Sequence, residues 1–441
     1  MKLAVVVQRY GAAINGGAEL HARYVAERLS RHAEVEVLTT CAKDYVTWRN
    51  EWPAGVEEIN GVPVRRFPVR RERQPLLFGR LSHHVFEHPH SVADELAWLA
   101  SEGPESPALI DHLAATAGSL DFALLFSYRY YHAWHGARRL PGKAVLVPTA
   151  ERDPAIALSI FGPTFRGVRA VMYNSHEERA MIHAATGNQE VPGVVVGVGS
   201  DVPAATAPDR FRRKFKLDRP FAIYVGRIDE NKGCGELFAF FQRYAATFPR
   251  GLDLVLVGSA IIPVPPHPRI HHLGFLSDED KFDAIAASDV LIMPSYFESL
   301  SMVALEAWAL GRPVLANGRC DVLKGQCIRS GAGLYYERYE EFAETLFALE
   351  SNGPLHRRLG QNGRDYFERH YTWPVIERKY LEMFDRLRAE APPAAPRRIE
   401  PLPGWLARRR RTVAAAAAIL AGIPSGAAAS GRGLQDLSRS A

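Results

Sequence analysis

Short runs of apolar residues alternate with longer amphipathic stretches along most of the chain. In the first half the apolar runs cover residues 3–7, 35–40, 122–127, 144–148 and 168–174. In the second half they cover residues 221–225, 252–257, 290–293 and 313–316. Near-continuous apolar strands separated by helices are typical of parallel sheets that are covered on both faces. The pattern therefore predicts an α/β protein with two doubly wound, Rossmann-like domains, whose ligands bind in the cleft beyond the carboxyl ends of the strands.

Breaks in this pattern divide the chain. A Gly-rich turn at residues 197–199 leads into residues 201–218, whose Pro, Ala and basic side chains predict a linker. We therefore expect one domain over residues 1–205, a second over residues 206–370 and a closing helix over residues 371–390. The remaining residues, 391–441, are rich in Ala, Pro and Arg, which predicts a disordered, low-complexity tail.

The net charge of +5 resides in this tail, where eight Arg face two acidic residues, so that the remaining 390 residues sum to −1. A nucleic-acid-binding domain carries a basic surface of its own, so the composition argues against nucleic acid as a partner. Trp405 and Leu406, followed by four arginines at 408–411, predict either peripheral contact with an anionic membrane or a solvated tail.

The cysteines and the apolar runs indicate in which cellular compartment the protein is expected. The four cysteines are scattered without a CxxC pair, so neither a metal site nor a disulfide framework is expected. The apolar runs at residues 3–7 and 413–423 are too short for a signal peptide and a membrane span, respectively. We therefore expect a cytoplasmic protein, with membrane association through the tail as the alternative.

In each domain, a glycine-rich turn follows the first strand. Gly16 and Gly17 open a helix that ends near Ser30, where bare N–H groups can receive an anion, although a tight turn without a ligand has the same sequence. In the second domain, Gly226 and Arg227 precede Lys232 and Gly233. A guanidinium and an ammonium five residues apart suit a diphosphate, and two solvated loop charges are the alternative.

The segment at residues 294–306 carries the sharpest signal. Glu298 lies at the turn before a predicted helix, Ser299 or Ser301 can cap that helix, and Glu306 lies further inside it. Carboxylates near a phosphate site can accept hydrogen bonds from sugar or ribose hydroxyls. Apolar residues surround Glu306. Its carboxylate is therefore either exposed on one edge of the helix or buried there because it has a function.

The Glu-x7-Glu spacing of Glu298 and Glu306, together with the two glycine-rich turns, resembles family 4 of the retaining, nucleotide-sugar-dependent glycosyltransferases. The resemblance covers residues 1–390 and implies the GT-B fold, with an acceptor-side first domain and a donor-side second domain. It implies that Arg227 and Lys232 bind the donor diphosphate, Glu298 approaches the donor sugar and Glu306 holds the ribose. It further implies donor contacts for these residues: Gly16, Gly17, Gly226, Phe275, Leu276, Ser299, Leu300 and Ser301.

One departure from the family concerns the first domain. Many relatives place a His near the donor sugar, but the matching segment here, residues 147–153, contains none. Either Glu151 or Asp153 replaces it, or the contact is dispensable, or the acceptor chemistry differs. Three histidines elsewhere are further alternatives: His132, His135 and His176.

The resemblance implies an enzyme, a hexosyltransferase that moves a hexose from a UDP- or GDP-sugar to a hydroxyl of a saccharide, lipid-linked or small-molecule acceptor. It implies no obligatory cofactor or metal. Residues 278–280, nominally an Asp-x-Asp motif, follow Ser277 and are better interpreted as the acidic first turn of a capped helix. The rival hypotheses are a non-catalytic nucleotide-sugar-binding partner of another transferase and a sugar epimerase of the same fold.

Overall fold

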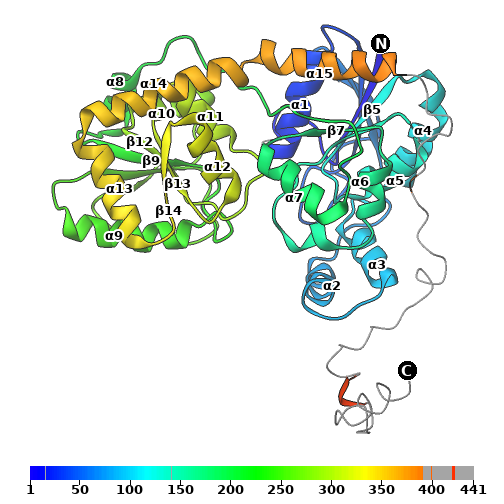
Figure 1. Cartoon of the computed structure of the whole chain (residues 1–441), viewed down its shortest axis with the longest axis horizontal. Helices are drawn as coiled ribbons and strands as arrows, with labels where there is room; N and C mark the ends of the chain where they lie inside the picture. The colour runs from blue at the N-terminus through cyan, green and yellow to red at the C-terminus, as the bar shows by residue number, and fades with distance from the viewer. Residues whose placement is uncertain (15, 141, 391–398, 400–419, 423–441) are drawn as a thin grey trace, which may run out of the picture.

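Figure 1 shows a computed structural model of the chain, which describes residues 1–14, 16–140, 142–390, 399 and 420–422. Two α/β domains lie side by side, each built on a parallel sheet with helices on both faces, which confirms the predicted fold class. The tail expected at residues 391–441 lies outside the described residues apart from 399 and 420–422. No helix within the described ranges is long and apolar enough to cross a membrane.

The first sheet has eight strands in the described part of the chain, parallel except for the hairpin at one edge. Their order is β3 (Gly55–Ile59), β4 (Val62–Phe67), β2 (Glu34–Thr40), β1 (Lys2–Val6), β5 (Phe122–Phe126), β6 (Ala144–Val147), β7 (Ala170–Tyr173) and β8 (Gly193–Val195). The second sheet has six parallel strands, in the order β11 (Ile270–His272), β10 (Asp253–Val257), β9 (Phe221–Val225), β12 (Val290–Met293), β13 (Val314–Asn317) and β14 (Gly333–Tyr336).

Helices connect the strands and cover the sheets. In the first domain they are α1 (Gly17–Leu29), α2 (Pro75–Glu87), α3 (Val92–Glu102), α4 (Pro107–Thr116), α5 (Tyr131–Arg139), α6 (Gly162–Gly167) and α7 (His176–Thr186), with 3-10 turns at Ala117–Ser119 and Pro154–Ala157. Thereafter follow α8 (Pro208–Phe215), α9 (Cys234–Thr247), α10 (Asp278–Ala287), α11 (Met302–Ala309), α12 (Asp321–Ser330), α13 (Tyr339–Ser351), α14 (Gly353–His370) and α15 (Trp373–Ala389).

Successive side chains of the central strands pack alternately into the apolar cores on the two faces of the sheet. On β1, Leu3 and Val5 pack into one apolar cluster, whereas Ala4 and Val6 pack into the cluster on the other face. Successive side chains of a strand point to opposite faces, so a strand without polar residues must be covered on both. This is why every residue of β5 and β6 is buried.

The last helix, α15, returns from the second domain to the first (Figure 1). Its buried face includes Phe384, which stacks on Phe122 of β5 at a centroid distance of 5.4 Å. Arg169 donates a hydrogen bond of 2.8 Å to the carbonyl of Leu387. This packing ties α15 to the first domain.

Two parts of the fold differ from the prediction. The segment predicted to be a linker, residues 201–218, contains α8, because Phe211 is buried and Arg210 pairs with Asp283 of α10 at 2.5 Å. The hairpin β3–β4 was not predicted, although Asn60 and Gly61 at its turn, with φ of 51° and 79°, form the Asn-Gly pair typical of such turns.

Candidate active site

A pocket of about 500 Å³ lies between the carboxyl ends of the two sheets. First-domain lining residues come from the start of α1 and from the loops after β5, β6 and β7. Second-domain lining residues come from β9, β12 and the loops after them, and from α10 and α11. Of the residues predicted from the sequence, the lining includes Gly17, Glu151, Asp153, Gly226, Arg227, Lys232, Glu298, Ser299, Leu300, Ser301 and Glu306.

The two second-domain cations have different surroundings. Arg227 is half exposed, pairs with Asp229 and donates a hydrogen bond of 3.2 Å to the hydroxyl of Tyr45 in the first domain. Lys232 Nζ lies 2.8 Å from Glu298 Oε1. Burial opposes the charge of Lys232, but the carboxylates of Glu298 and Glu151 raise its pKa above the ordinary value, so the ammonium is retained.

A glycine allows the loops after β9 and β12 to approach each other closely. Gly233 has a φ of 71°, and a Cβ there would lie 2.1 Å from the carbonyl oxygen of Pro294. Only glycine combines this backbone conformation with so close an approach. Gly233 therefore brings Lys232 to the loop that carries Glu298.

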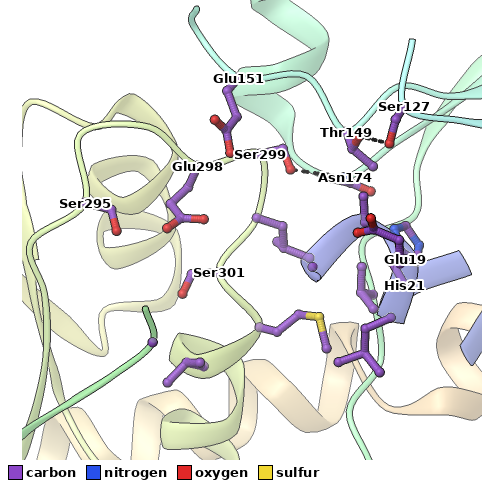
Figure 2. A pocket seen from close by; sticks show the side chains of 18 of the residues that line it. Glu19, His21, Ser127, Thr149, Glu151, Asn174, Ser295, Glu298, Ser299 and Ser301 are labelled. Carbon is purple, nitrogen blue, oxygen red and sulfur yellow. Dashed lines mark hydrogen bonds between the residues drawn. The ribbon is translucent and has the colours of Figure 1, made fainter. Parts of the chain in front are cut away.

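The loop after β12 leads into the N-terminus of α11 at the pocket. Ser301 caps this helix, since its hydroxyl accepts a hydrogen bond of 3.2 Å from the N–H of Ala304. The hydroxyl of Ser299 instead accepts a hydrogen bond of 3.3 Å from the amide of Asn174 in the first domain (Figure 2). Of the two alternatives for the cap, Ser301 is correct, and the helix retains N–H groups without intrahelical partners beside the pocket.

Glu306 is buried, with 4% of its surface exposed, so its carboxylate does not lie at the solvent edge of the helix. Oε1 lies 3.1 Å from Lys281 Nζ on α10 and accepts a hydrogen bond of 3.1 Å from Ser200. Burial raises the pKa of Glu306, while the Lys281 ammonium acts in the opposite direction. Oε2 is buried without a hydrogen-bond partner among the described residues, so it can accept one more donor.

Of the two glycines in the first domain, Gly16 makes room for a side chain of α1 and Gly17 lines the pocket. A Cβ at Gly16 would lie 2.2 Å from Glu19 Oε2, so the absence of a side chain makes room for Glu19. Glu19 in turn pairs with Arg9 at 2.6 Å. Gly17 and Glu19 line the pocket, whereas Gly16 is not among the described residues that do.

Glu151 lies across the pocket from Glu298 (Figure 2). Burial raises the pKa of Glu151 to about 7, with Glu298 and Asp153 adding to the rise and Lys232 opposing it. Asp153 is engaged differently, because it pairs with Arg129 and accepts a hydrogen bond of 3.3 Å from Tyr128. In the part of the chain that the structure describes, the Glu151 carboxyl makes neither a hydrogen bond nor an ion pair, so it is the freer of the two.

The three alternative histidines lie elsewhere. His132 is buried against the carbonyl of Phe126 at 2.8 Å, and burial lowers the pKa of both His132 and His135 to about 4. His176 lines a different pocket. The histidine that does line this pocket is His21 of α1, whose pKa burial lowers to about 3.

Several pocket residues were not predicted from the sequence. Lys281 and Asn174 reach the site only through the packing of α10 and of the loop after β7. Ser127 directly follows β5 and Thr149 lies two residues after β6; their φ values are 62° and 47°, and their hydroxyl oxygens lie 2.9 Å apart. A β-branched residue at positive φ is rare, and such backbone strain clusters at functional sites.

Phe275 and Leu276 lie away from the described lining of the pocket. Phe275 is 70% exposed, and Leu276 is partly buried. Residues 278–280 form the acidic first turn of α10, and Ser277 accepts a hydrogen bond of 3.2 Å from the N–H of Asp280, as predicted. Within the described ranges no group of three or more His, Cys, Asp or Glu side chains could hold a metal ion.

Two doubly wound domains that face each other across this pocket define the GT-B class of glycosyltransferase folds. Solved structures of the class align over most of the chain. Anabaena HepE in complex with UDP has a TM-score of 0.65 at 18% identity, over 88% of this chain and 100% of that one. Sucrose-phosphate synthase from Thermosynechococcus elongatus has a TM-score of 0.64 at 18% identity, with the same coverage. The GT-B fold expected from the resemblance is therefore confirmed.

Sequence comparisons indicate which group of glycosyltransferases the chain resembles. Residues 206–366 match the family model of the glycosyl transferases group 1. D-inositol 3-phosphate glycosyltransferase of Corynebacterium efficiens is 25% identical over 230 residues, which is 47% of this chain and 54% of that protein. An uncharacterized glycosyltransferase of Methanocaldococcus jannaschii is 22% identical over 419 residues, 87% of this chain and 98% of that protein. The chain spans about half the length of the first curated relatives it matches, and these matches support kinship with group 1.

Proposed function

We propose that the protein is a retaining glycosyltransferase of the family 4 type, which transfers a hexose from a nucleoside-diphosphate sugar to an acceptor hydroxyl. The observation that carries the proposal is the convergence, in one pocket, of two cations, a helix N-terminus and a buried carboxylate oxygen without a partner. Each of these features matches one part of such a donor.

The diphosphate would lie between Arg227, Lys232 and the first turn of α11. Cationic side chains and unpaired N–H groups at a helix start both favour phosphate oxygens. The free Oε2 of Glu306 would accept a ribose hydroxyl, since a carboxylate acts only as an acceptor. The Lys281 ammonium, 3.1 Å from Glu306 Oε1, favours the charged form of that carboxyl and opposes the effect of burial on its pKa. Gly226 leaves room for the backbone of the loop to approach the donor.

In the proposed reaction, the bond between the anomeric carbon and the diphosphate oxygen breaks while the acceptor oxygen bonds to the same face of the sugar. The diphosphate leaves with the bonding electrons and takes up the acceptor proton. Arg227, Lys232 and the α11 amides stabilise the negative charge that grows on the leaving oxygen. Exclusion of water between the two domains suppresses hydrolysis of the donor.

In the first domain, Glu151 is the better candidate for a donor-sugar contact than Asp153. Its carboxyl lies across the pocket from Glu298, whereas Asp153 is already paired with Arg129. With a pKa near 7, Glu151 can accept a hydrogen bond from a sugar hydroxyl when ionised or donate one when protonated.

UDP- and GDP-hexoses both remain donors in this proposal, and UDP is the first to test because similar structures were solved with UDP and UDP-glucose. The acceptor is a saccharide, a lipid-linked saccharide or a small metabolite. D-inositol 3-phosphate glycosyltransferase and a lipopolysaccharide core glycosyltransferase of Rhizobium meliloti illustrate that range among the relatives.

Calorimetric titration with UDP, GDP, UDP-glucose and GDP-mannose would test donor binding, and release of nucleoside diphosphate would measure turnover. Arg227→Gln should weaken binding, whereas Arg378→Gln, a solvent-facing change on α15, should not. Failure of every nucleotide to bind would refute the proposal.

The absence of a histidine in residues 147–153 favours one alternative, a non-catalytic nucleotide-sugar-binding partner of another transferase. Binding without release of nucleoside diphosphate would support it. Interconversion of sugar isomers on the nucleotide would instead identify an epimerase of this fold.

A further inference from the structure

A second pocket, of about 370 Å³, lies where the two domains meet. Its first-domain walls are α7 and β8, and its second-domain walls are α12 and α14, with α15 closing it. None of its lining residues lines the candidate active site. We call it the junction pocket. A ligand bound there would touch both domains at once.

The lining of the junction pocket is cationic. Five of its side chains carry or can carry a positive charge: His176, Arg329, Arg369, His370 and Lys379. No Asp or Glu is among its described lining residues. Buried or half-buried clefts of one sign of charge concentrate counter-ions of the opposite sign.

Carboxylates near the junction pocket neutralise only part of this positive charge. Arg329 pairs with Glu177, whereas the guanidinium of Arg369 lies 3.9 Å from the carboxylate of Asp365 and donates a hydrogen bond of 3.2 Å to the Asp365 carbonyl. Lys379 Nζ donates to two backbone carbonyls, those of Val196 at 2.9 Å and His370 at 3.3 Å. Carbonyls accept its hydrogen bonds without cancelling its charge.

The pKa values of three titratable groups in the junction pocket are lowered by burial and by neighbouring cations. Burial and, to a smaller extent, the neighbouring charge of Arg378 together lower the pKa of Lys379 to about 8. Burial also lowers the pKa of His176 and of His370, and neighbouring cations act in the same direction on both. In all three groups burial is the larger cause and the nearby cations add to it, so each pKa is lowered.

Neutral donors complete the site. The hydroxyls of Tyr366 and Tyr371 lie 3.4 Å apart within the lining. Phosphate oxygens are bound in proteins by cations together with hydroxyl and N–H donors. The volume falls within the range of pockets that hold small molecules and exceeds what one phosphate group needs.

We propose that the junction pocket binds a small phosphorylated metabolite, with the phosphate between Lys379 and Arg369 and an uncharged hydroxylated body beside the tyrosines. Because Arg369 lies on α14, Lys379 on α15 and His176 on α7 of the first domain, the ligand bridges elements of both domains. Its binding therefore stabilises one relative orientation of the two domains and regulates the cleft between them.

Calorimetric titration with glucose 6-phosphate tests the site directly, with glucose as the matched uncharged probe and inorganic phosphate as the minimal anion. The test variants are Lys379→Gln and Arg369→Gln. The control on the same helix is Arg378→Gln, whose side chain faces solvent beside Glu382. The double variant R227Q/K232Q removes the cations of the candidate active site instead.

We expect glucose 6-phosphate to bind the full chain, glucose not to bind, and each test variant to weaken binding at least tenfold. Arg378→Gln and the double variant should stay within twofold of the original chain. Loss of binding in the double variant would place the anion in the active site and overturn the proposal, as would unchanged binding in both test variants or no binding at all. Arg369 is largely exposed, so R369Q separates loss of binding from loss of folding.

Discussion

Replacing Glu151 by Gln should stabilise the protein at alkaline pH and leave its stability unchanged in acid. Burial raises the pKa of Glu151 from 4.5 to about 7, so the folded protein holds this proton more tightly than the unfolded chain does. The stabilising contribution of the carboxyl is therefore fully present below pH 4.5 and is lost as the pH rises through 7. Glutamine keeps the shape and cannot ionise.

The size of the effect follows from the two pKa values. Their difference corresponds to roughly 3 kcal/mol at about 1.4 kcal/mol per pH unit. Because the carboxyl faces a water-accessible pocket, we expect about 1–2 kcal/mol of unfolding free energy at pH 8. For a domain of this size that is a rise in Tm of about 2–8 °C.

Scanning calorimetry of Glu151→Gln and the original chain between pH 4.5 and 8.5 would measure the difference in Tm. Glu58→Gln, on the exposed edge strand β3, is the control and should show no pH-dependent difference. Asp153→Asn should have the opposite sign, because it removes a partner of Arg129. An equal Tm difference for Glu151→Gln at both ends of the range would refute the reasoning.

Three further predictions concern binding and location. Glu306→Gln should weaken nucleotide affinity more than it lowers Tm, because its free oxygen faces the proposed ribose; a lower Tm with unchanged affinity in calorimetric titration would contradict that role. Arg227→Ala and Lys232→Ala should each lower kcat/KM about tenfold or more, since a charge-assisted hydrogen bond contributes ~1.5–3 kcal/mol, and activity within about twofold of the original in both would refute the diphosphate contact. Removal of residues 391–441 should abolish salt-sensitive binding to anionic liposomes in a sedimentation assay while donor turnover is unchanged; equal binding by both forms would exclude the tail as the anchor.

The strands and the loops after them could be predicted from the sequence, because their signals are local. An apolar run such as residues 221–225 has to be buried on both faces, and the glycines and charges that follow it then lie at the carboxyl edge of the sheet. The acidic first turn of α10 and a serine cap of α11 depend on neighbours within three residues, and both were predicted. The sequence left Ser299 and Ser301 open as that cap, and the structure has Ser301. The hairpin β3–β4 was missed even though its turn signal is local as well.

Contacts between distant segments were decided only by the tertiary structure. The partners of Glu306 are Lys281 and Ser200, which come from another helix and from the segment between the domains. The position of Glu151 opposite Glu298 likewise requires two sheets to face each other. The sequence determined which chemistry each loop carries, because residue type and spacing are local properties. Packing of the two domains determined which of those groups meet, since a buried carboxylate takes its pKa and its partners from whatever surface closes over it.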